Sequence, residues 1–184
     1  RHFPTNFYKN YFKLKHKQKL VVGESTGTYL FHSEVSKRIK EHIPNVKLIV
    51  MLKNPIKSIY SRYYVFRNEG LESSSFEDVI KMEMERIKIG DERNELRINN
   101  PEFGHIANFN YLRHCYYAEK LKNWLKEFKK EQILILTNDE FNTDIDKTLK
   151  KTFEFLDLPN HTIKNKIKHN VGKYPKMHES TRKL

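Results

Sequence analysis

A cation and a hydroxyl stand at the start of one predicted helix. The run 47–52 is almost wholly aliphatic and predicts a buried strand, and Lys53 follows it directly. Asn54 and Pro55 are residue types that cap and open a helix, and Ser61 lies seven residues after the cap, two turns along on the same face. A helix N-terminus at the carboxyl end of a strand attracts anions, so Lys53 and Ser61 could share one phosphate. An ordinary strand-to-helix turn, with a solvated lysine and a surface serine, would give the same pattern.

A polar loop with two glycines, residues 23–29, follows another apolar run. The glycines are too close together for the phosphate loop G-x-x-x-x-G-K-[ST], and Thr28 stands where that loop has its lysine. We therefore interpret the segment as a strand-end loop whose hydroxyls and carboxylate face a cleft. Glu24 could act on a substrate hydroxyl, but a capping or ion-pairing role explains it equally well.

A third candidate is the late loop 170–175, in which glycine and proline frame a lysine and an aromatic residue. Such a loop could close over an anionic ligand. A plain surface turn is the alternative. The side chains and backbone available for closure are those of Asn170, Gly172, Lys173 and Tyr174.

The composition adds a strong positive charge and argues against metal chemistry. Lys and Arg number 35 against 23 Asp and Glu, which gives a net charge of +12 over 184 residues. This excess favours an anionic partner, such as nucleic acid, a phosphate-bearing cofactor, an acidic polysaccharide or a membrane surface, although a lysine-rich solvated surface also produces it. Cys115 is the single cysteine, and the nine histidines lack zinc-site spacing, so we expect neither a disulfide nor a metal centre. No apolar run approaches the roughly 20 residues that span a bilayer.

Strand-like and helix-like segments alternate along the chain. Apolar runs predict three strands, and apolar residues at helical spacing predict helices between and after them. The alternation indicates an α/β fold in a single domain over 1–184. The predicted strands are 19–22, 47–52 and 132–137, and the predicted helices are 33–42, 55–67, 111–128 and 145–156, with further helix starts at Ser75 and at Asp139 with Glu140.

In this order the segments resemble the sulfotransferase family, in particular its bacterial-type and heparan sulfate branch. The stretch from N-P to Y-S is the most specific piece, and the other segments support it by order and spacing over nearly the whole chain. Residues 23–30 look like the family's G-E-x-[ST]-P-x-Y segment, 43–55 like P-x-x-K-L-I-v-x-L-R-N-P, 56–63 like a-Y-S-x-Y, 70–77 like G-x-E-x-x-S-F-e, and 173–177 like K-Y-P-x-M.

The resemblance implies a P-loop-NTPase-like three-layer α/β fold with a central parallel sheet, incomplete at the N-terminus. It also implies transfer of a sulfuryl group from 3′-phosphoadenosine 5′-phosphosulfate (PAPS) to a hydroxyl or amine, with a carbohydrate as one candidate acceptor and no metal or nucleic acid. Such transfers depend chiefly on positioning and charge stabilisation. Carried over by position, the site residues are Lys53 and Ser61 for the 3′-phosphate, Asn170, Gly172, Lys173 and Tyr174 over the cofactor, and Glu24, Thr26 and Tyr29 on the acceptor side.

The sequence also departs from the family pattern. Lys53 stands where the family usually has Arg, which keeps the charge but loses the bidentate fork. Gly27 replaces a common Pro, and the late loop lacks a K-G-R lead-in. The family's 5′-phosphosulfate loop and catalytic glutamate lie before a segment like 1–3. We therefore expect a partial chain that catalyses poorly by itself, with Glu24 left as the catalytic candidate.

Two other functions stay open on the sequence alone. A non-catalytic basic module would bind nucleic acid or an acidic glycan, with an affinity that falls steeply with salt. A nucleotide kinase would need a Walker-type loop and a magnesium site, and the sequence contains no such loop. The single cysteine favours a reducing compartment such as the cytoplasm, and the sequence indicates neither the acceptor nor the oligomeric state.

Overall fold

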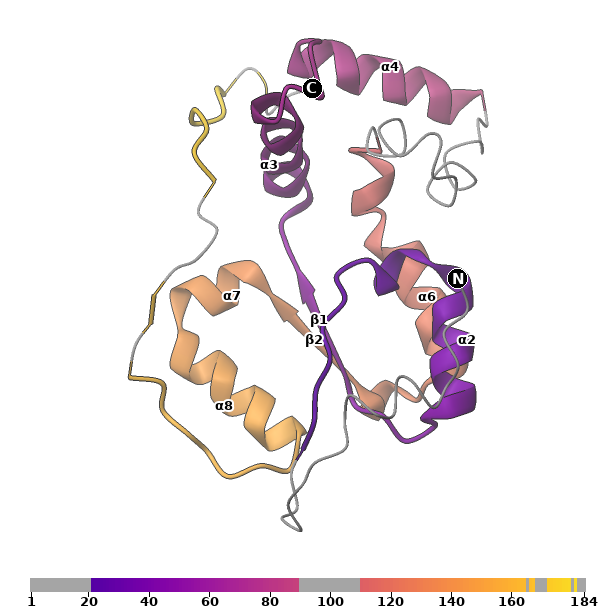
Figure 1. The fold of residues 1–184 in the computed structure, drawn as a ribbon, viewed down its shortest axis with the longest axis vertical. Coiled ribbons are helices and arrows are strands. Elements are labelled where there is room, and N and C mark those ends of the chain that lie inside the picture. Colours follow the sequence, from indigo (N-terminus) through magenta and orange to yellow (C-terminus); the bar gives the residue numbers. More distant parts are fainter. Residues whose placement is uncertain (1–20, 90–109, 165, 168–171, 180, 182–184) are drawn as a thin grey trace.

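The computed structural model describes residues 21–89, 110–164, 166–167, 172–179 and 181, and in these two parallel strands lie between groups of helices (Figure 1). β1 (Leu48–Leu52) pairs with β2 (Ile133–Thr137) in parallel, with the first residues opposite one another and the last residues likewise. The helices are α2 (Ser33–His42), α3 (Pro55–Asn68), α4 (Phe76–Lys88), α6 (Tyr117–Glu127), α7 (Asn138–Thr143) and α8 (Ile145–Phe155), with short 3-10 helices η1 (Tyr29–Phe31), η4 (Arg113–Cys115) and η5 (Lys130–Gln132). Figure 1 shows α7 and α8 on one side of the strands and α2 and α6 on the other, which is the layered α/β arrangement that the sequence predicts.

Most elements predicted from local patterns are confirmed within one residue. The caps explain this accuracy: Asn54 Oδ1 accepts the N–H of Lys57 at 3.2 Å and Pro55 opens α3, while Ser75 Oγ accepts the N–H of Asp78 at 3.2 Å at the start of α4. The confirmed segments are helices 33–42, 55–67 and 145–156, strands 47–52 and 132–137, and the helix starts at Ser75 and at Asp139 with Glu140.

The strand predicted at 19–22 is wrong where the structure describes it. Val21 and Val22 lie outside any strand and are 57% and 45% exposed, and residues 19–20 lie outside the described residues. The two-stranded sheet contains only β1 and β2 among the described residues, so this apolar run has no strand partner there.

The helix predicted at 111–128 starts six residues later than expected, at Tyr117. The apolar period that predicts the helix is carried by residues 117–128, whereas Tyr111 and Cys115 are buried for a tertiary reason. The backbone N–H groups of residues 111–113 donate to the carboxylate of Glu83 in α4 at 2.8, 2.9 and 3.1 Å, which holds this segment out of the helix. The fully buried Glu83 thereby fixes where α6 begins.

The sheet is less covered than its aliphatic sequence predicts. Ile49 and Met51 on β1 are 43% and 45% exposed, and Ile135 on β2 is 45% exposed. Runs of this kind suit strands buried on both faces, and two described strands leave much of each face uncovered. The tightest packing lies instead between α3, α4 and the segment before α6, in a cluster of Ile59, Tyr63, Phe66, Val79, Ile80, Tyr111 and Cys115.

α3 ends with a compact glycine turn. Gly70 has a positive φ of 71°, its N–H donates to the carbonyl of Arg67 at 3.2 Å, and the N–H of Leu71 donates to that of Phe66 at 2.9 Å. This pair of hydrogen bonds satisfies the last carbonyls of the helix and needs a left-handed residue, which glycine supplies without strain. The turn leads the chain into α4, which packs beside α3.

Candidate functional site

The predicted phosphate-binding residues lie where β1 meets α3. Lys53 directly follows β1, and Ser61 lies two turns into α3; both are half-buried. Among the described residues, neither the Lys53 ammonium nor the Ser61 hydroxyl has a recorded hydrogen-bond partner. A half-buried cation and hydroxyl without protein partners are suited to an anionic ligand.

The backbone at the start of α3 contributes less than a typical helix N-terminus. Pro55 has no N–H, and the N–H of Lys57 is already bonded to the side chain of Asn54. Only Ile56 of the first three helical residues keeps an N–H for a ligand in the described structure. Positive charge at this site must therefore come mainly from side chains.

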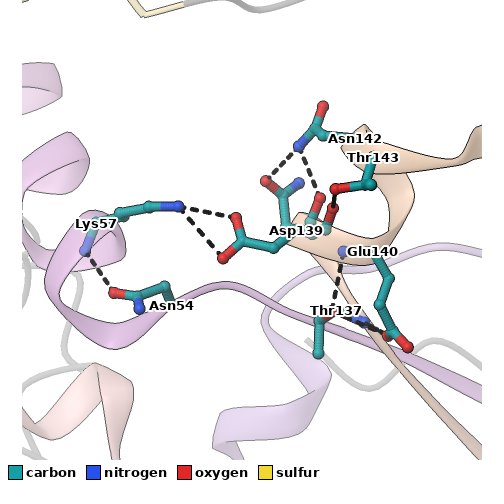
Figure 2. Close-up of polar contacts among 8 residues, drawn as sticks. Asn54, Lys57, Thr137, Asp139, Glu140, Asn142 and Thr143 are labelled. Carbon is teal, nitrogen blue, oxygen red and sulfur yellow. Dashed lines mark hydrogen bonds and ion pairs between the residues drawn. The ribbon is translucent and has the colours of Figure 1, made fainter.

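Lys57 is the cation that the sequence analysis missed. Its ammonium lies 3.0 and 3.2 Å from the two carboxylate oxygens of Asp139, and Figure 2 shows the two side chains pointing toward one another. Lys57 lies four residues after Lys53 and four before Ser61, so the helical i,i+4 spacing could have indicated it. Its partner in α7 is 82 positions away in sequence, and no local pattern predicts that contact.

The start of α7 is held by side chains other than that of Asp139. Thr137 Oγ1 accepts the N–H of Glu140 at 3.1 Å, and Glu140 Oε2 accepts the N–H of Thr137 at 3.1 Å, which forms a capping box (Figure 2). Thr137 Oγ1 also donates to Glu140 Oε2 at 2.9 Å, and this bond, followed by that of the Thr137 N–H, lowers the pKa of the Glu140 carboxyl. Thr143 Oγ1 donates to the backbone carbonyl of Asp139 at 2.8 Å. The backbone of Asp139 is thus fixed by these contacts, and its carboxylate forms the ion pair with Lys57.

The late loop lies against α3. The ring of Tyr174 stacks on that of Tyr64, with centroids 5.6 Å apart and an interplanar angle of 16°, and meets Tyr60 edge-on at 5.9 Å. A Cβ added to Gly172 would lie 2.2 Å from Tyr174 Cε1, so the ring packs directly on the glycine backbone. This contact gives a steric reason for glycine at this position.

A second contact places the late loop on the Ser61 side of α3. Asn68 Nδ2 donates to the carbonyl of Lys173 at 3.4 Å. Tyr64 and Asn68 lie three and seven residues after Ser61, which is one helical stripe. The structure therefore brings the predicted residues 172–174 and Ser61 to one helix, while Asn170 lies outside the described residues.

A cavity of about 470 Å³ lies beside this loop, between it, α3 and the start of α4. Burial, with a smaller contribution from the Tyr64 hydroxyl 3.4 Å away, raises the pKa of Tyr60 to about 12, so its hydroxyl stays protonated. The cavity is lined by tyrosines and by mixed charges: Tyr60, Tyr63, Tyr64, Arg67, Ser75, Phe76, Glu77, Pro175, Lys176, His178 and Thr181.

The three predicted acceptor-side residues form a separate group. Thr26 Oγ1 donates to Glu24 Oε1, and the N–H of Tyr29 donates to the carbonyl of Thr26 at 3.1 Å. Glu24 and Thr26 are exposed, and Tyr29 is half-buried. Within the described parts of the chain, no recorded hydrogen bond or ion pair joins this group to Lys53 or Ser61.

The acceptor-side segment is anchored by an aromatic contact. Phe31, in η1 just after Tyr29, stacks on His114 with ring centroids 3.8 Å apart. Burial, together with the cations Arg62 and Lys120, lowers the pKa of His114 to about 3. The imidazole is therefore neutral at physiological pH, which suits a stacking role.

The described residues give no sign of a metal centre or a membrane span. No group of three or more His, Cys, Asp or Glu side chains could hold an ion within the part of the chain that the structure describes. No helix in those same residues is long and apolar enough to cross a bilayer.

Comparison with known proteins identifies the family. The sequence profile of the sulfotransferase domain matches residues 6–183. The chain belongs to the sulfotransferase domain family. A solved structure with a TM-score of 0.73 and 22% identity, covering 98% of this chain and 64% of the other, is a sulfotransferase from Alicyclobacillus acidocaldarius. The P-loop-like α/β fold of sulfotransferases is therefore that of this chain.

Curated relatives of this sulfotransferase domain are larger proteins. A bifunctional heparan sulfate N-deacetylase/N-sulfotransferase 1 of Caenorhabditis briggsae is 25% identical over 157 residues, which is 83% of this chain and 17% of the relative. The carbohydrate sulfotransferase 15 of Homo sapiens is 29% identical over 117 residues, which is 62% of this chain and 21% of the relative. The chain thus spans about a fifth of the length of these relatives. Members of the family generally use PAPS.

Proposed function

We propose that this sulfotransferase domain binds the 3′-phosphate end of PAPS at the start of α3 and takes part in sulfuryl transfer to a hydroxyl or amine. The arrangement of residues along α3 carries the proposal. Lys53 and Ser61 are half-buried and lack recorded protein partners among the described residues, and the late loop packs on the same stripe of α3 as Ser61. The family match supports PAPS as the anionic ligand, since members of the family generally use it.

The residues present fit a phosphate. The Lys53 ammonium would balance its charge, and the Ser61 hydroxyl would donate a hydrogen bond to one of its oxygens. Lys carries three donors on a flexible stem, so Lys53 would act as a point charge rather than as the planar fork of an arginine. We assign to Lys173 and Tyr174 the role of covering the nucleotide from the late loop.

When bound, PAPS supplies the activated sulfuryl group. The chain's own contribution is to hold the nucleotide by its distal phosphate, so that the reactive end is presented in a fixed place. Of the candidates in the chain, Glu24 is the carboxylate that we assign to the acceptor side. The hydrogen bond from the Thr26 hydroxyl to the Glu24 carboxylate supports a polar surface for an acceptor hydroxyl there.

We further propose a carbohydrate acceptor, with Glu24, Thr26 and Tyr29 on its side of the cleft. Two observations support this choice. The relatives described above include a heparan sulfate N-deacetylase/N-sulfotransferase and a carbohydrate sulfotransferase. The net charge of +12 would attract an acidic polysaccharide.

The test is a calorimetric titration with adenosine 3′,5′-bisphosphate beside ADP, which lacks the 3′-phosphate. We expect preference for the 3′-phosphate ligand, and for Ser61→Ala a loss of about ten- to a hundredfold in affinity, the usual effect of removing one hydrogen bond to a charged group. Ser36→Ala is the control, because it removes a helical hydroxyl in α2 that bonds only to a nearby carbonyl. Equal affinity for both ligands, unchanged by the Ser61 substitution, would contradict the proposal. A steep, ligand-independent fall of polyanion binding with salt would then favour a basic binding module.

A further inference from the structure

Lys57 lies between the two residues assigned to the 3′-phosphate. It is in the first turn of α3, four positions after Lys53 and one turn before Ser61. Side chains four apart on a helix have Cβ atoms about 5–6 Å from one another. The Lys57 ammonium, on its four-carbon stem, can therefore reach a phosphate that Ser61 binds.

In the structure the Lys57 ammonium is already paired with an anionic side chain. The carboxylate of Asp139 lies 3.0 and 3.2 Å from the ammonium and comes from the helix that follows β2 (Figure 2). Since β1 and β2 are parallel and end opposite one another, this carboxylate lies at the sheet edge where α3 begins. Asp139 thus places a negative charge beside the proposed phosphate site.

We infer that Lys57 is a further 3′-phosphate-binding residue and that Asp139 is its internal competitor, a carboxylate that holds Lys57 without ligand and is exchanged for the phosphate on binding. The inference rests on the proposed function and deepens it. Asp139 would then set the affinity of the site and keep Lys57 near it when no ligand is bound.

The exposure of the pair permits the exchange. The side chains of Lys57 and Asp139 are 59% and 55% exposed, so either can rotate into solvent without leaving a buried charge unpaired. An exposed ion pair of this kind contributes little net stability. A doubly charged phosphate with three oxygens is the stronger partner for a lysine.

The packing of α7 does not depend on the Asp139 carboxylate. The capping box of Thr137 and Glu140 and the bond from Thr143 to the Asp139 carbonyl hold the helix start. Breaking the ion pair therefore leaves the fold intact. It also leaves the Asp139 charge close to the bound phosphate, where like-charge repulsion lowers affinity.

The experiment measures adenosine 3′,5′-bisphosphate affinity for the unsubstituted protein, Lys57→Gln, Asp139→Asn and the double variant. Asp139→Asn should bind about two- to fivefold more tightly, which is the size of an exposed ion pair. Lys57→Gln should bind about five- to tenfold more weakly, since a charge-assisted bond to phosphate is lost. In the Lys57→Gln background the second substitution should give a smaller gain, because no lysine is left to release. ADP binding should change little.

Two matched variants control for charge alone. Lys151→Gln removes a lysine that pairs with Glu140 at 3.3 Å, and Asp146→Asn removes a carboxylate that pairs with Lys166 at 2.6 Å. Both should leave the affinity within about twofold, since each residue pairs with a partner outside the proposed site and exposed charges are screened by salt.

The outcomes separate this inference from the proposed function. The first case is that the unsubstituted protein prefers the 3′-phosphate ligand and Ser61→Ala weakens binding. If Asp139→Asn then leaves the affinity unchanged or lowers it, the ion pair is only structural and the inferred exchange is wrong. An equal gain for ADP would also overturn it, because the effect would then be unspecific. If the unsubstituted protein shows no preference for the 3′-phosphate, the proposed function fails, and the exchange fails with it.

Discussion

Replacing the buried Glu83 should destabilise the protein more than replacing any exposed charge on the same helix. Its side chain is fully buried, and its carboxylate accepts three consecutive backbone N–H groups, those of residues 111–113, at 2.8, 2.9 and 3.1 Å. Glu83→Ala would orphan these donors beside the fully buried Tyr111. An orphaned buried N–H costs about 1–3 kcal/mol. Allowing for partial relaxation toward water, we expect a loss of about 3–5 kcal/mol in unfolding free energy.

Glu83→Gln provides a finer test of the same reasoning. Glutamine keeps one acceptor oxygen, but its amide group points donor hydrogens at a backbone N–H, so we expect a loss of about 2–3 kcal/mol. The control is Glu85→Gln, two residues along α4, where the side chain is 68% exposed and pairs with Lys88 at 2.7 Å. That substitution should cost less than about 0.5 kcal/mol.

The assay is urea unfolding followed by circular dichroism, with amide hydrogen exchange of residues 110–115 measured in parallel. We expect these amides to lose protection selectively in Glu83→Gln, since their acceptor is what holds them. Equal unfolding free energies for Glu83→Gln and Glu85→Gln would refute the claim that this carboxylate fixes the start of α6.

Three further predictions follow from the same contacts. The folded-state pKa of His114 is lowered from 6.5 to about 3, so the contribution of His114 to stability is complete above pH 6.5 and is lost as the pH falls toward 3. In urea unfolding, His114→Phe should therefore lose less free energy of unfolding between pH 7 and 4.5 than the unsubstituted protein does. Gly172→Ala places a Cβ 2.2 Å from the Tyr174 ring and should displace the ring. We expect adenosine 3′,5′-bisphosphate binding to weaken several-fold, while the unfolding free energy changes by less than about 1 kcal/mol. Unchanged calorimetric affinity would contradict a covering role for the loop. Lys53→Gln should weaken that ligand about tenfold in calorimetry, whereas Lys53→Arg should bind it equally or more tightly, and equal losses for both would show that charge is not what Lys53 contributes.

The sequence predicts the local parts of this fold well because they depend on signals within a few residues. Asn54 and Pro55 define the start of α3, and helix 33–42 has the predicted bounds. The strands 47–52 and 132–137 are recognisable as aliphatic runs, and their parallel pairing follows from the helices between them. The same reasoning fails for 19–22, where the apolar run resembles a strand but has no described partner.

The non-local contacts could not be predicted. The pairing of Lys57 with Asp139 joins residues 82 positions apart, and Glu83 reaches 28 to 30 positions along the chain to its three donors. The second contact also explains why the helix predicted at 111–128 begins later, at Tyr117: residues 111–113 are bonded to a buried carboxylate, which no local pattern indicates. The residues assigned to the 3′-phosphate and to the acceptor stay predictions until ligand binding is measured.

The start of α3 explains why the proposed 3′-phosphate site would depend on lysine side chains. Proline at the first helical position and the Asn54 cap give a well-defined helix, but together they leave few backbone N–H groups for a ligand. Binding of an anion there must then depend on side-chain cations. Lys53 directly precedes the Asn54 cap, and Lys57 lies in the first turn of α3. A site built from two flexible lysines gains charge but little geometric definition, because each lysine has several accessible conformations. A neighbouring carboxylate that restricts one lysine, as we propose for Asp139, would lower the affinity somewhat while giving the site a better-defined geometry.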